Sequence, residues 1–537
     1  MTTTGTSALP PARPRRRAAA LALGAAVLLG APAALRAQDL RIGLGAAITS
    51  LDPQFYVIGS NSALARNIFD GLVNQDDHQR VEPGLAREWR AVDDRTWEFT
   101  LRDGARFHDG SPVEAEDVAA SLRRVAAIRN SPSSFLPYVR FIASVEVLDP
   151  KRLRIYTREP TPLILNSLSR IAILPRAAEN TDTAELNAGR GVIGSGPYRF
   201  ASYLPGDRVE LVAADPQPGA PAPAWKRVSL RFIPNDAARI SALLAGDVDV
   251  IENVPPSDIE RLRRGDRVSV SSVPSNRVMY LHLDHERERT PFATARDGSP
   301  IPNPFRDERV RRALSLSVDR QALVTRIMDG QGTPTGQLVP EGYFGYVPGL
   351  AAPRTDLAAA RRLLAEAGLP QGFKLVLHAS NDRYPNDDKV AQALAQMWTR
   401  AGIPTEVVTQ PGSVFFTRAS NREYSLIMGG AAAETGEASS VLRPLLATYD
   451  PERGDGSGNR GRYSNPRFDA LLRQALATVD DNAREALLRQ ATELAMGEEG
   501  VIPLFLLSYS WATRAGFTYA PRSDGWTLAV NARPATP

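Results

Sequence analysis

The sequence contains no cysteine in its 537 residues. That absence excludes disulfide bonds, thiolate metal sites and a cysteine nucleophile. It also excludes a lipid-modified cysteine, so we expect no lipid anchor. Histidine is scarce, and of its five residues only His282 and His285 lie close together. At the two-residue period of a strand their side chains fall on opposite faces, so we predict no metal site and no cofactor.

The common motifs of catalysis and of nucleic-acid binding are also missing. We find no phosphate-binding loop, no dinucleotide-binding fingerprint and no G-x-S-x-G nucleophile elbow. The formal net charge is +4, but residues 1–37 hold five arginines and no acid, which leaves −1 for the rest. Nucleic-acid binding needs clustered surplus base. We therefore expect neither an enzyme nor a nucleic-acid-binding protein.

Long hydrophobic runs are absent as well. The apolar run within residues 1–37 is shorter than the ~20 residues that cross a bilayer. It follows an arginine-rich segment and precedes a cleavage site that ends at Ala37, the arrangement of a secretory signal peptide. We predict a signal peptide over residues 1–37, cleaved between Ala37 and Gln38, and export to a periplasm. The pair Arg16-Arg17 leaves twin-arginine export open as an alternative.

The sequence does contain a clear strand pattern over residues 96–101. Trp97, Phe99 and Leu101 alternate with polar residues, which is the period of a half-buried strand. An Asp-Gly turn follows. We predict that residues 105–107 form the return strand of a hairpin.

The next segment predicts an amphipathic helix. It begins either at Ser111, as a capping box with proline at the first helical position, or at Glu114. One face carries Val118, Leu122 and Val125, and the opposite, polar face carries Glu114, Asp117 and Arg124.

Strand and helix patterns alternate along the rest of the chain and indicate an α/β protein with mixed sheets. Strands are predicted at residues 39–44, 145–148, 153–156, 228–233, 247–251, 278–283, 374–378, 405–409, 424–427 and 502–506. Helices are predicted at residues 236–245, 309–328, 357–367, 388–401 and 468–476, besides one that opens at residues 59–62.

The segment FTLRDGARFHDGSPVEAEDVAASL, residues 99–122, resembles the signature of a known family. The family is that of extracytoplasmic solute-binding proteins of ABC importers, family 5, the dipeptide, oligopeptide and nickel-binding group. Further segments resemble the same family in the same order: residues 51–53, 68–73, 82–89, 194–198, 309–320 and 463–469. The resemblance therefore covers almost the whole chain after residue 37.

This resemblance implies a type II periplasmic binding fold, with two lobes joined by a hinge and an extra N-terminal subdomain. We expect lobe I to comprise residues 38–73, 191–274 and 502–537. The extra subdomain would comprise residues 74–190, and lobe II residues 275–501.

The resemblance also implies a function. We expect a monomer that captures a short peptide or peptide-like solute in the cleft between the lobes. It would deliver this ligand to an inner-membrane permease with its ATPase subunits. A nickel chelate, a glutathione-like compound, an opine or an oligosaccharide remain open as ligands. An exported hydrolase, or a sensor or chaperone without a permease, is the alternative role.

One loop is the best candidate for ligand contact. Residues 430–434 resemble the family's G-W-x-A-D segment, whose acid receives the ligand's α-amino group. Gly430 and Ala433 match that segment, Ala431 stands in place of tryptophan, and Glu434 replaces the aspartate. A carboxylate at a strand end can pair with an ammonium, and small neighbours let a ligand approach. Further candidates are Tyr56, Ser60, Asn61, Arg418, Glu437 and Arg443.

Overall fold

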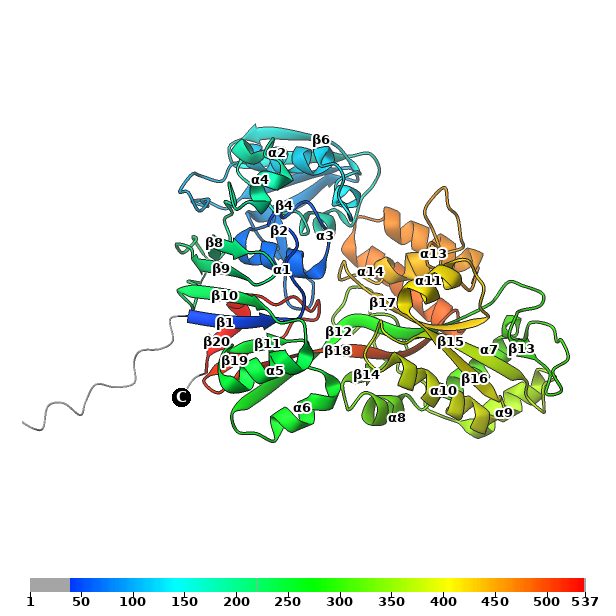
Figure 1. Cartoon of the computed structure of the whole chain (residues 1–537). Helices are drawn as coiled ribbons and strands as arrows, with labels where there is room; N and C mark the ends of the chain where they lie inside the picture. The colour runs from blue at the N-terminus through cyan, green and yellow to red at the C-terminus, as the bar shows by residue number, and fades with distance from the viewer. Residues whose placement is uncertain (1–38, 220, 536–537) are drawn as a thin grey trace, which may run out of the picture. The chain divides into compact units, whose positions relative to one another are not determined.

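The computed structural model describes residues 39–219 and 221–535 (Figure 1). The predicted signal peptide lies outside these residues. Residues 39–537 form one compact unit, built on a mixed sheet of twelve strands in the order β13-β15-β17-β12-β18-β11-β1-β10-β9-β8, with β14 paired to β18 and β16 to β15. No helix of the described residues is both long and apolar enough to cross a bilayer.

The first half of the large sheet surrounds the first strand of the chain. β1 (Asp39–Leu44) runs parallel to both β10 (Arg227–Phe232) and β11 (Val250–Glu252). Beyond β10 lie β9 (Arg208–Ala213) and β8 (Tyr198–Leu204). The helices of this half are α1 (Gly59–Ile68), α5 (Asp236–Ala245) and α6 (Pro256–Arg263), and a hairpin of β19 (Phe517–Tyr519) and β20 (Ala532–Pro534) packs on its core.

The second half of the sheet is covered by a larger set of helices. Its strands are β13 (Ala293–Thr294), β14 (Gly332–Pro334), β15 (Lys374–Ser380), β16 (Thr405–Gln410) and β17 (Leu426–Ala432). Its helices are α7 (Glu308–Leu316), α8 (Arg320–Ala322), α9 (Leu357–Glu366), α10 (Asp387–Ala401), α11 (Gly412–Ser420), α12 (Ser439–Leu446), α13 (Pro466–Ala477) and α14 (Asp481–Gly497). Two large apolar cores and a small third cluster around Phe415 fill this half.

Two long antiparallel strands, β12 (Val268–Leu283) and β18 (Ile502–Arg514), connect the halves. Their pairing is regular up to Pro274, opposite Ser508, and resumes at Val278, opposite Leu506. The residues between Pro274 and Val278 leave the ladder, so the connection has a built-in interruption at the boundary between the two halves.

A smaller four-stranded sheet, in the order β4-β5-β7-β6, has its own core. Its strands are β4 (Ala86–Asp93), β5 (Thr96–Leu101), β6 (Ile142–Asp149) and β7 (Arg152–Thr157), and a two-stranded sheet of β2 (Val73–Gln75) and β3 (Val81–Pro83) precedes it. The helices here are α2 (Ala115–Ala127), α3 (Ile164–Leu168) and α4 (Thr183–Asn187), with a 3-10 turn over Leu136–Tyr138.

Most predicted elements are present, but the predicted hairpin is wrong. β5 pairs with β4 and β7, and residues 105–107 form no strand. Only an isolated bridge joins Arg106 to Pro112. The Asp-Gly turn reverses the chain as expected, but the strand that completes the sheet comes from 50 residues further along the sequence.

Three further boundaries differ from the sequence prediction. The helix predicted over residues 309–328 breaks after Leu316, because the side chain of Asp319 caps a new helical start at the backbone N–H of Ala322, 2.9 Å away. The strand predicted over residues 247–251 is the shorter β11. The strand predicted at residues 424–427 continues to Ala432, so Gly430 and Ala431 lie in β17 and not in a loop.

Helix α2 begins at the second of the two predicted positions. Glu114 is its N-cap residue and forms a reciprocal capping box with Asp117. Val118, Leu122 and Val125 are buried as predicted. The polar face is also buried, however: Asp117 and Arg124 are each 3% exposed. Two residues of the predicted polar face are thus buried, whereas Arg123 and Ala126 of the same helix are exposed.

Candidate ligand-binding site

The loop that follows β17, residues 433–437, is held by side chains from distant parts of the chain. The side-chain amide of Gln79 donates to the backbone oxygen of Glu434 at 3.3 Å. The amides of Gln75 and Asn166 both donate to the oxygen of Thr435, at 3.1 and 2.6 Å. These three residues come from β2, the β2–β3 turn and α3. The second half of the large sheet is thereby joined to the segment that carries the small sheet.

Glu434, the main sequence candidate, is exposed at this loop. Burial raises the pKa of Tyr138, the Arg170 charge lowers it, and the Glu434 charge raises it further. The charges of Glu434 and Arg170 thus both act on the same phenol, which lines a pocket together with Arg170.

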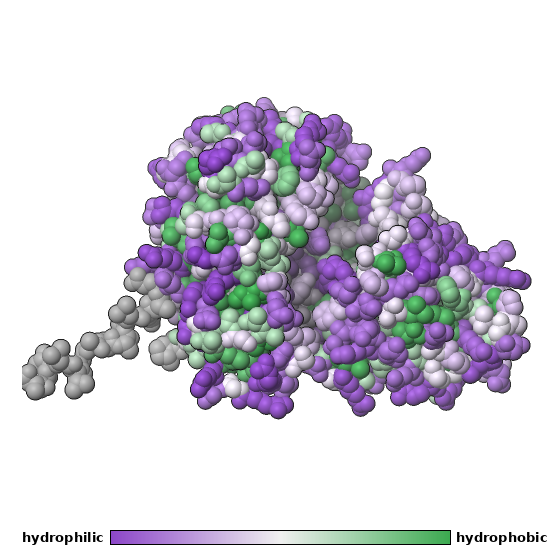
Figure 2. All heavy atoms as spheres, viewed as in Figure 1, coloured by the Kyte–Doolittle hydropathy of each residue, from purple (hydrophilic) through white to green (hydrophobic). Residues whose placement is uncertain are grey.

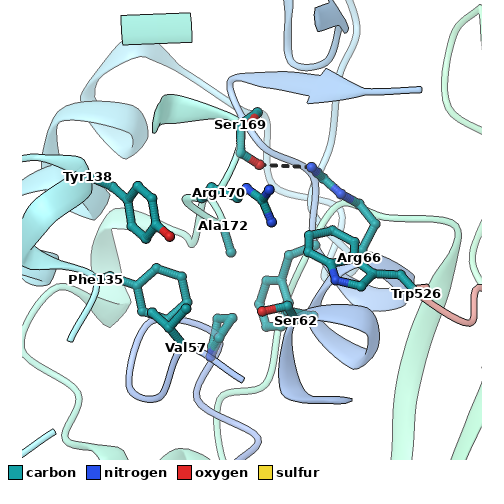
Figure 3. Close-up of a pocket in the computed structure, with 12 residues that line it drawn as sticks. Val57, Ser62, Arg66, Phe135, Tyr138, Ser169, Arg170, Ala172 and Trp526 are labelled. Carbon is teal, nitrogen blue, oxygen red and sulfur yellow. Dashed lines mark hydrogen bonds between the residues drawn. The ribbon is translucent and has the colours of Figure 1, made fainter. Parts of the chain in front are cut away.

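That pocket lies in the first half of the molecule, beside α1 (Figure 3). Arg66 and Ser62 of α1 line one side, and Phe135 and Tyr138 line the other. The Arg170 guanidinium lies between Tyr138 on one side and Arg66 and Trp526 on the other (Figure 3). The cavity volume is about 30 Å³. The indole of Trp526 lies under Arg170, whose Cζ is 5.2 Å from the ring centroid.

A second, larger cleft of about 800 Å³ reaches the other end of the same loop at Gly436. Trp89 and Trp97 of the small sheet line one wall, and Phe344 and Arg484 line the other. Figure 2 shows a hollow on this largely hydrophilic face, between the parts that contain the small sheet and α14. Its volume is in the range of small-molecule sites.

The small residues of β17 are positioned by the strand. Gly430 packs under Tyr384, whose hydroxyl donates to the Gly430 oxygen at 3.1 Å. A Cβ at Gly430 would lie 2.9 Å from the Tyr384 ring, so only glycine fits. Ala431 is half-buried opposite Val278, and Ala433 is fully buried, with its N–H donating to the Asn276 oxygen at 2.9 Å.

Glu437 is not a solvated rim acid. It is 2% exposed, accepts a hydrogen bond from the Ser439 hydroxyl at 2.6 Å and lies 3.2 Å from Nε of Arg484. Burial nevertheless raises the pKa of Glu437, since desolvation outweighs the attraction of Arg484. Its side chain is occupied by structural contacts.

The two candidate arginines are also engaged elsewhere. Arg418 pairs with Glu423 at 2.6 Å on the surface and lies over the ring of Tyr424. Tyr424 precedes β17, which is seven residues or about 20 Å long, so Arg418 lies at the opposite end of the strand from Glu434. Arg443 of α12 pairs with Asp455 at 2.7 Å.

The candidates at the start of α1 divide into structural and available residues. Asn61 is buried and exchanges hydrogen bonds with Thr49, through the Thr49 N–H at 2.9 Å and the Thr49 hydroxyl at 3.0 Å. Ser60 donates to the oxygen of Ala47 at 3.1 Å. Tyr56 is partly exposed. The structure thus brings together Glu434, Ala433 and Ala431, but not Arg418 or Arg443 with them.

Sequence reasoning missed the residues of the pocket. Arg66, Tyr138, Arg170 and Trp526 come from four separate segments and follow no motif. The closest sequence signal for this pocket is Arg170 itself, a charged residue within a mostly apolar stretch. From the sequence alone, such an arginine is expected to lie at the surface.

Comparisons with known proteins identify the family to which this chain belongs. The model of the bacterial extracellular solute-binding proteins, family 5 (middle region), matches residues 80–452. The chain is 27% identical over 505 residues to the probable D,D-dipeptide-binding periplasmic protein DdpA of Escherichia coli (strain K12), covering 91% of this chain and 93% of DdpA. It is 27% identical over 508 residues to the glutathione-binding protein GsiB of Shigella flexneri serotype 5b (strain 8401), covering 92% and 94%.

A solved structure agrees with this fold. The unliganded open form of the periplasmic murein tripeptide binding protein MppA matches with a TM-score of 0.79 at 23% identity, over 93% of this chain and 98% of MppA. The fold and its cleft define a solute-binding protein of an ABC transporter. The chain belongs to the bacterial extracellular solute-binding proteins, family 5, whose members bind a solute and do not catalyse a reaction.

Proposed function

We propose that this protein captures a short peptide or peptide-like solute next to the loop of residues 433–437. The observation that carries the proposal is the exposed carboxylate of Glu434 on a backbone fixed by three side-chain amides. A carboxylate in that position can accept two or three charge-assisted hydrogen bonds from a ligand ammonium. Ala431 next to it gives a roomier and less aromatic site than a tryptophan would.

The relatives differ in the chemical class of the ligand that they are named for. The ligands in their names include D,D-dipeptides, glutathione, nickel and agropinic acid. Peptides and glutathione carry a free α-amino group, and Glu434 favours that class. Mass spectrometry of the compounds that co-purify with the protein from its native host will identify the class, and a ligand without an amino group would contradict the role of Glu434.

We place the protein in a periplasm, delivering its ligand to an inner-membrane permease with ATPase subunits. Several relatives are named as periplasmic proteins, and residues 1–37 have the pattern of a signal peptide. Osmotic shock should release a protein whose N-terminus is Gln38. Recovery only in the membrane fraction would contradict this location.

Binding should also close a hinge. We propose that residues 38–73, 191–274 and 502–537 form one lobe with residues 74–190 as its extra subdomain, and residues 275–501 the other. β12 and β18 join the two, and their interrupted pairing is a natural pivot. Small-angle scattering should give a smaller radius of gyration with saturating ligand. An unchanged radius with a ligand that binds would disprove closure.

A charge-removal cycle tests the role of Glu434. The probes are Ala-Ala-Ala and its N-acetylated form, and the variants are Glu434→Gln and, as a control, Glu493→Gln at an exposed position on α14. Losing one partner of a desolvated charge pair costs about 2–5 kcal/mol, or roughly 30- to several-thousand-fold in affinity. We expect that loss for Glu434→Gln with the free amine and not with the acetylated probe, measured by calorimetry.

Additive effects of the mutation and of acetylation would mean that Glu434 does not contact the amine. The control variant should bind both probes as the wild type does, because its carboxylate lies outside the site. A loss of similar size in Glu493→Gln would point to a general charge effect instead.

A further inference from the structure

The turn between β2 and β3 contains a residue whose backbone conformation is unfavourable. Gln79 has a φ of 60°, in the left-handed region that glycine adopts at lower cost. It is also buried, with 2% of the residue exposed. Strained backbone of this kind persists only where the surrounding structure holds it, and it is typical of functional sites. The side chain of Gln79 is therefore a candidate for a role that glycine could not supply.

The side-chain amide of Gln79 has a fixed orientation. Its oxygen accepts hydrogen bonds from the Asn276 amide at 3.1 Å and from the Tyr343 hydroxyl at 2.8 Å. With two donors on the oxygen, the NH2 group faces the loop of residues 433–437, where it donates to the backbone oxygen of Glu434 at 3.3 Å. Asn276 and Tyr343 are both buried, so these bonds form away from water and gain strength from the low local dielectric.

The turn that carries Gln79 is itself anchored on its other side. Ser523 donates through its backbone N–H and through its hydroxyl to the backbone oxygen of Asp77, at 3.0 and 2.7 Å. The Ser523 hydroxyl also lies 2.7 Å from that of Tyr343. The segment near the C-terminus thus holds both the turn and one of the two donors to the Gln79 amide. Gln79 therefore binds the loop from a fixed support.

The turn and the loop are also in direct backbone contact. Gly436 has a φ of 78°, and a Cβ at this position would lie 2.3 Å from the backbone oxygen of Gln79. Glu434 lies two residues before this contact and is exposed, whereas Ala433 and Gly436 are buried. The exposed carboxylate is thus attached to a backbone that Gln79 holds twice, through its side-chain amide at Glu434 and through close packing at Gly436.

We propose that Gln79 is a positioning residue of the ligand site, which fixes the Glu434 carboxylate for the ligand's amino group by holding the Glu434 backbone. The proposal rests on the proposed function, because Glu434 is the ligand contact there. Hydrogen bonds weaken steeply when their geometry is poor, so a carboxylate on a displaced backbone loses part of its bond to an ammonium. The preference for a free amine is thus set in part by a turn that lies 355 residues earlier in the sequence.

Binding of Ala-Ala-Ala and of its N-acetylated form separates positioning from general stability. Gln79→Met keeps the length of the side chain and removes its hydrogen bonds. Gln337→Met is the matched control, because Gln337 is another buried glutamine whose amide holds a different loop, at Val347. In calorimetry, Gln79→Met should lower the affinity for the free amine about 3- to 10-fold, the range for one neutral hydrogen bond. It should leave the acetylated probe unaffected, and Gln337→Met should change neither affinity.

A smaller substitution covers the case in which Gln79→Met does not fold. Tyr343→Phe removes only the hydroxyl that donates to the Gln79 oxygen, and near-UV circular dichroism shows whether each variant is folded. The loss of affinity should again appear only with the free amine, at about 2- to 3-fold, because one of the two donors to Gln79 remains. An equal loss with both probes would contradict the positioning role.

The hold on the loop can also be measured without any ligand. A glutamate-specific protease cleaves the bond after Glu434 only when the loop opens locally, so the rate of this cleavage reports how firmly the loop is held. Mass spectrometry follows the fragment that ends at Glu434, and Glu434→Gln, which removes the cleavage site, identifies it. Gln79→Met should accelerate the cleavage about 3- to 10-fold, and Gln337→Met should leave its rate unchanged.

The outcomes separate this proposal from the proposed function. An unchanged cleavage rate in Gln79→Met overturns the positioning role whatever the ligand is. An unchanged affinity of this variant for the free amine, or an equal loss with both probes, overturns it as well. Faster cleavage in Gln79→Met, together with no binding of either tripeptide to the wild type, means that Gln79 holds the loop and that the peptide-like function is wrong.

Discussion

Arg124 and Arg170 are two interior arginines in the same part of the molecule, but their surroundings are opposite. The Arg124 side chain donates to both oxygens of Asp52, at 2.9 and 2.7 Å, and also to Gln54 and to the backbone oxygen of Thr181. Nε of Arg124 meets no acceptor, but Arg170 lacks one at both Nε and Nη2 and has no carboxylate within 4.0 Å among the described residues. A guanidinium paired within the fold keeps its buried carboxylate partner neutralised, whereas buried guanidinium nitrogens without an acceptor cost stability.

The largest effect on stability should come from breaking the balanced pair. Arg124→Met leaves the carboxylate of Asp52 buried, with 1% of that residue exposed, and without its cation. Removing one partner of a buried ion pair costs about 3–5 kcal/mol. Urea unfolding followed by circular dichroism should show a loss of that size. A loss below about 1 kcal/mol would mean that the pair contributes little and that the contrast with Arg170 is false.

A smaller change at the same site should have a graded effect. The Thr183 hydroxyl donates to Asp52 at 2.7 Å, and Thr183→Val keeps the shape of the side chain while removing the donor. Hydrogen bonds to charged groups contribute about 1.5–3 kcal/mol, and we expect the lower end because Arg124 remains. The same urea titration measures it, and an unchanged midpoint would exclude the hydroxyl from the balance of charge.

An exposed pair gives the reference for a weak interaction. Arg418 and Glu423 are 2.6 Å apart with about two fifths of each side chain exposed. Such surface pairs typically contribute less than about 1 kcal/mol. Arg418→Gln should therefore leave the free energy of unfolding almost unchanged, and molar salt should remove any remaining difference. It should leave ligand affinity unchanged, because Arg418 lies at the far end of β17.

The smallest effect on stability should come from Arg170→Gln, although Nε and Nη2 of this arginine are buried. Removing an uncompensated charge relieves a desolvation cost, so the free energy of unfolding should stay within about 0.5 kcal/mol of wild type or rise. Thermal unfolding of the ligand-free protein will measure it. A loss of several kcal/mol would mean that Arg170 is a structural residue, like Arg124.

Local patterns predicted local structure well. α5 was predicted over its full observed length, because the Asn235 side chain caps its start and Gly246, at φ 81°, ends it. The failures required distant partners. Arg124 looked like a surface residue because its partner Asp52 lies 72 residues earlier in the sequence. The hairpin failed because β7, and not the adjacent segment, pairs with β5.

The candidate site shows the same division. Resemblance to the family predicted the position of Glu434 near the end of β17, and Glu437 was a further candidate for ligand contact near the same loop. No sequence pattern could show that Glu437 turns inward toward Arg484, because α14 reaches it through tertiary packing. Arg66, Tyr138, Arg170 and Trp526 of the pocket beside α1 are separated by up to several hundred positions, and only the folded chain brings them together.

The interruption in the pairing of β12 and β18 is also a point where hydrogen bonds from three separate segments meet. Inside it, the Asn276 backbone accepts from the N–H of Ala433, and its own N–H donates to the oxygen of Ser523. Its side chain donates to Gln79 at 3.1 Å. Asn276, at the proposed pivot, is thus hydrogen-bonded to the residue that precedes Glu434 and to the C-terminal segment that carries Trp526. It is also hydrogen-bonded to the β2–β3 turn, whose Gln79 binds the loop. Amide hydrogen exchange at Asn276 and Ala433 should therefore report, as a single coupled signal, whether the site is filled.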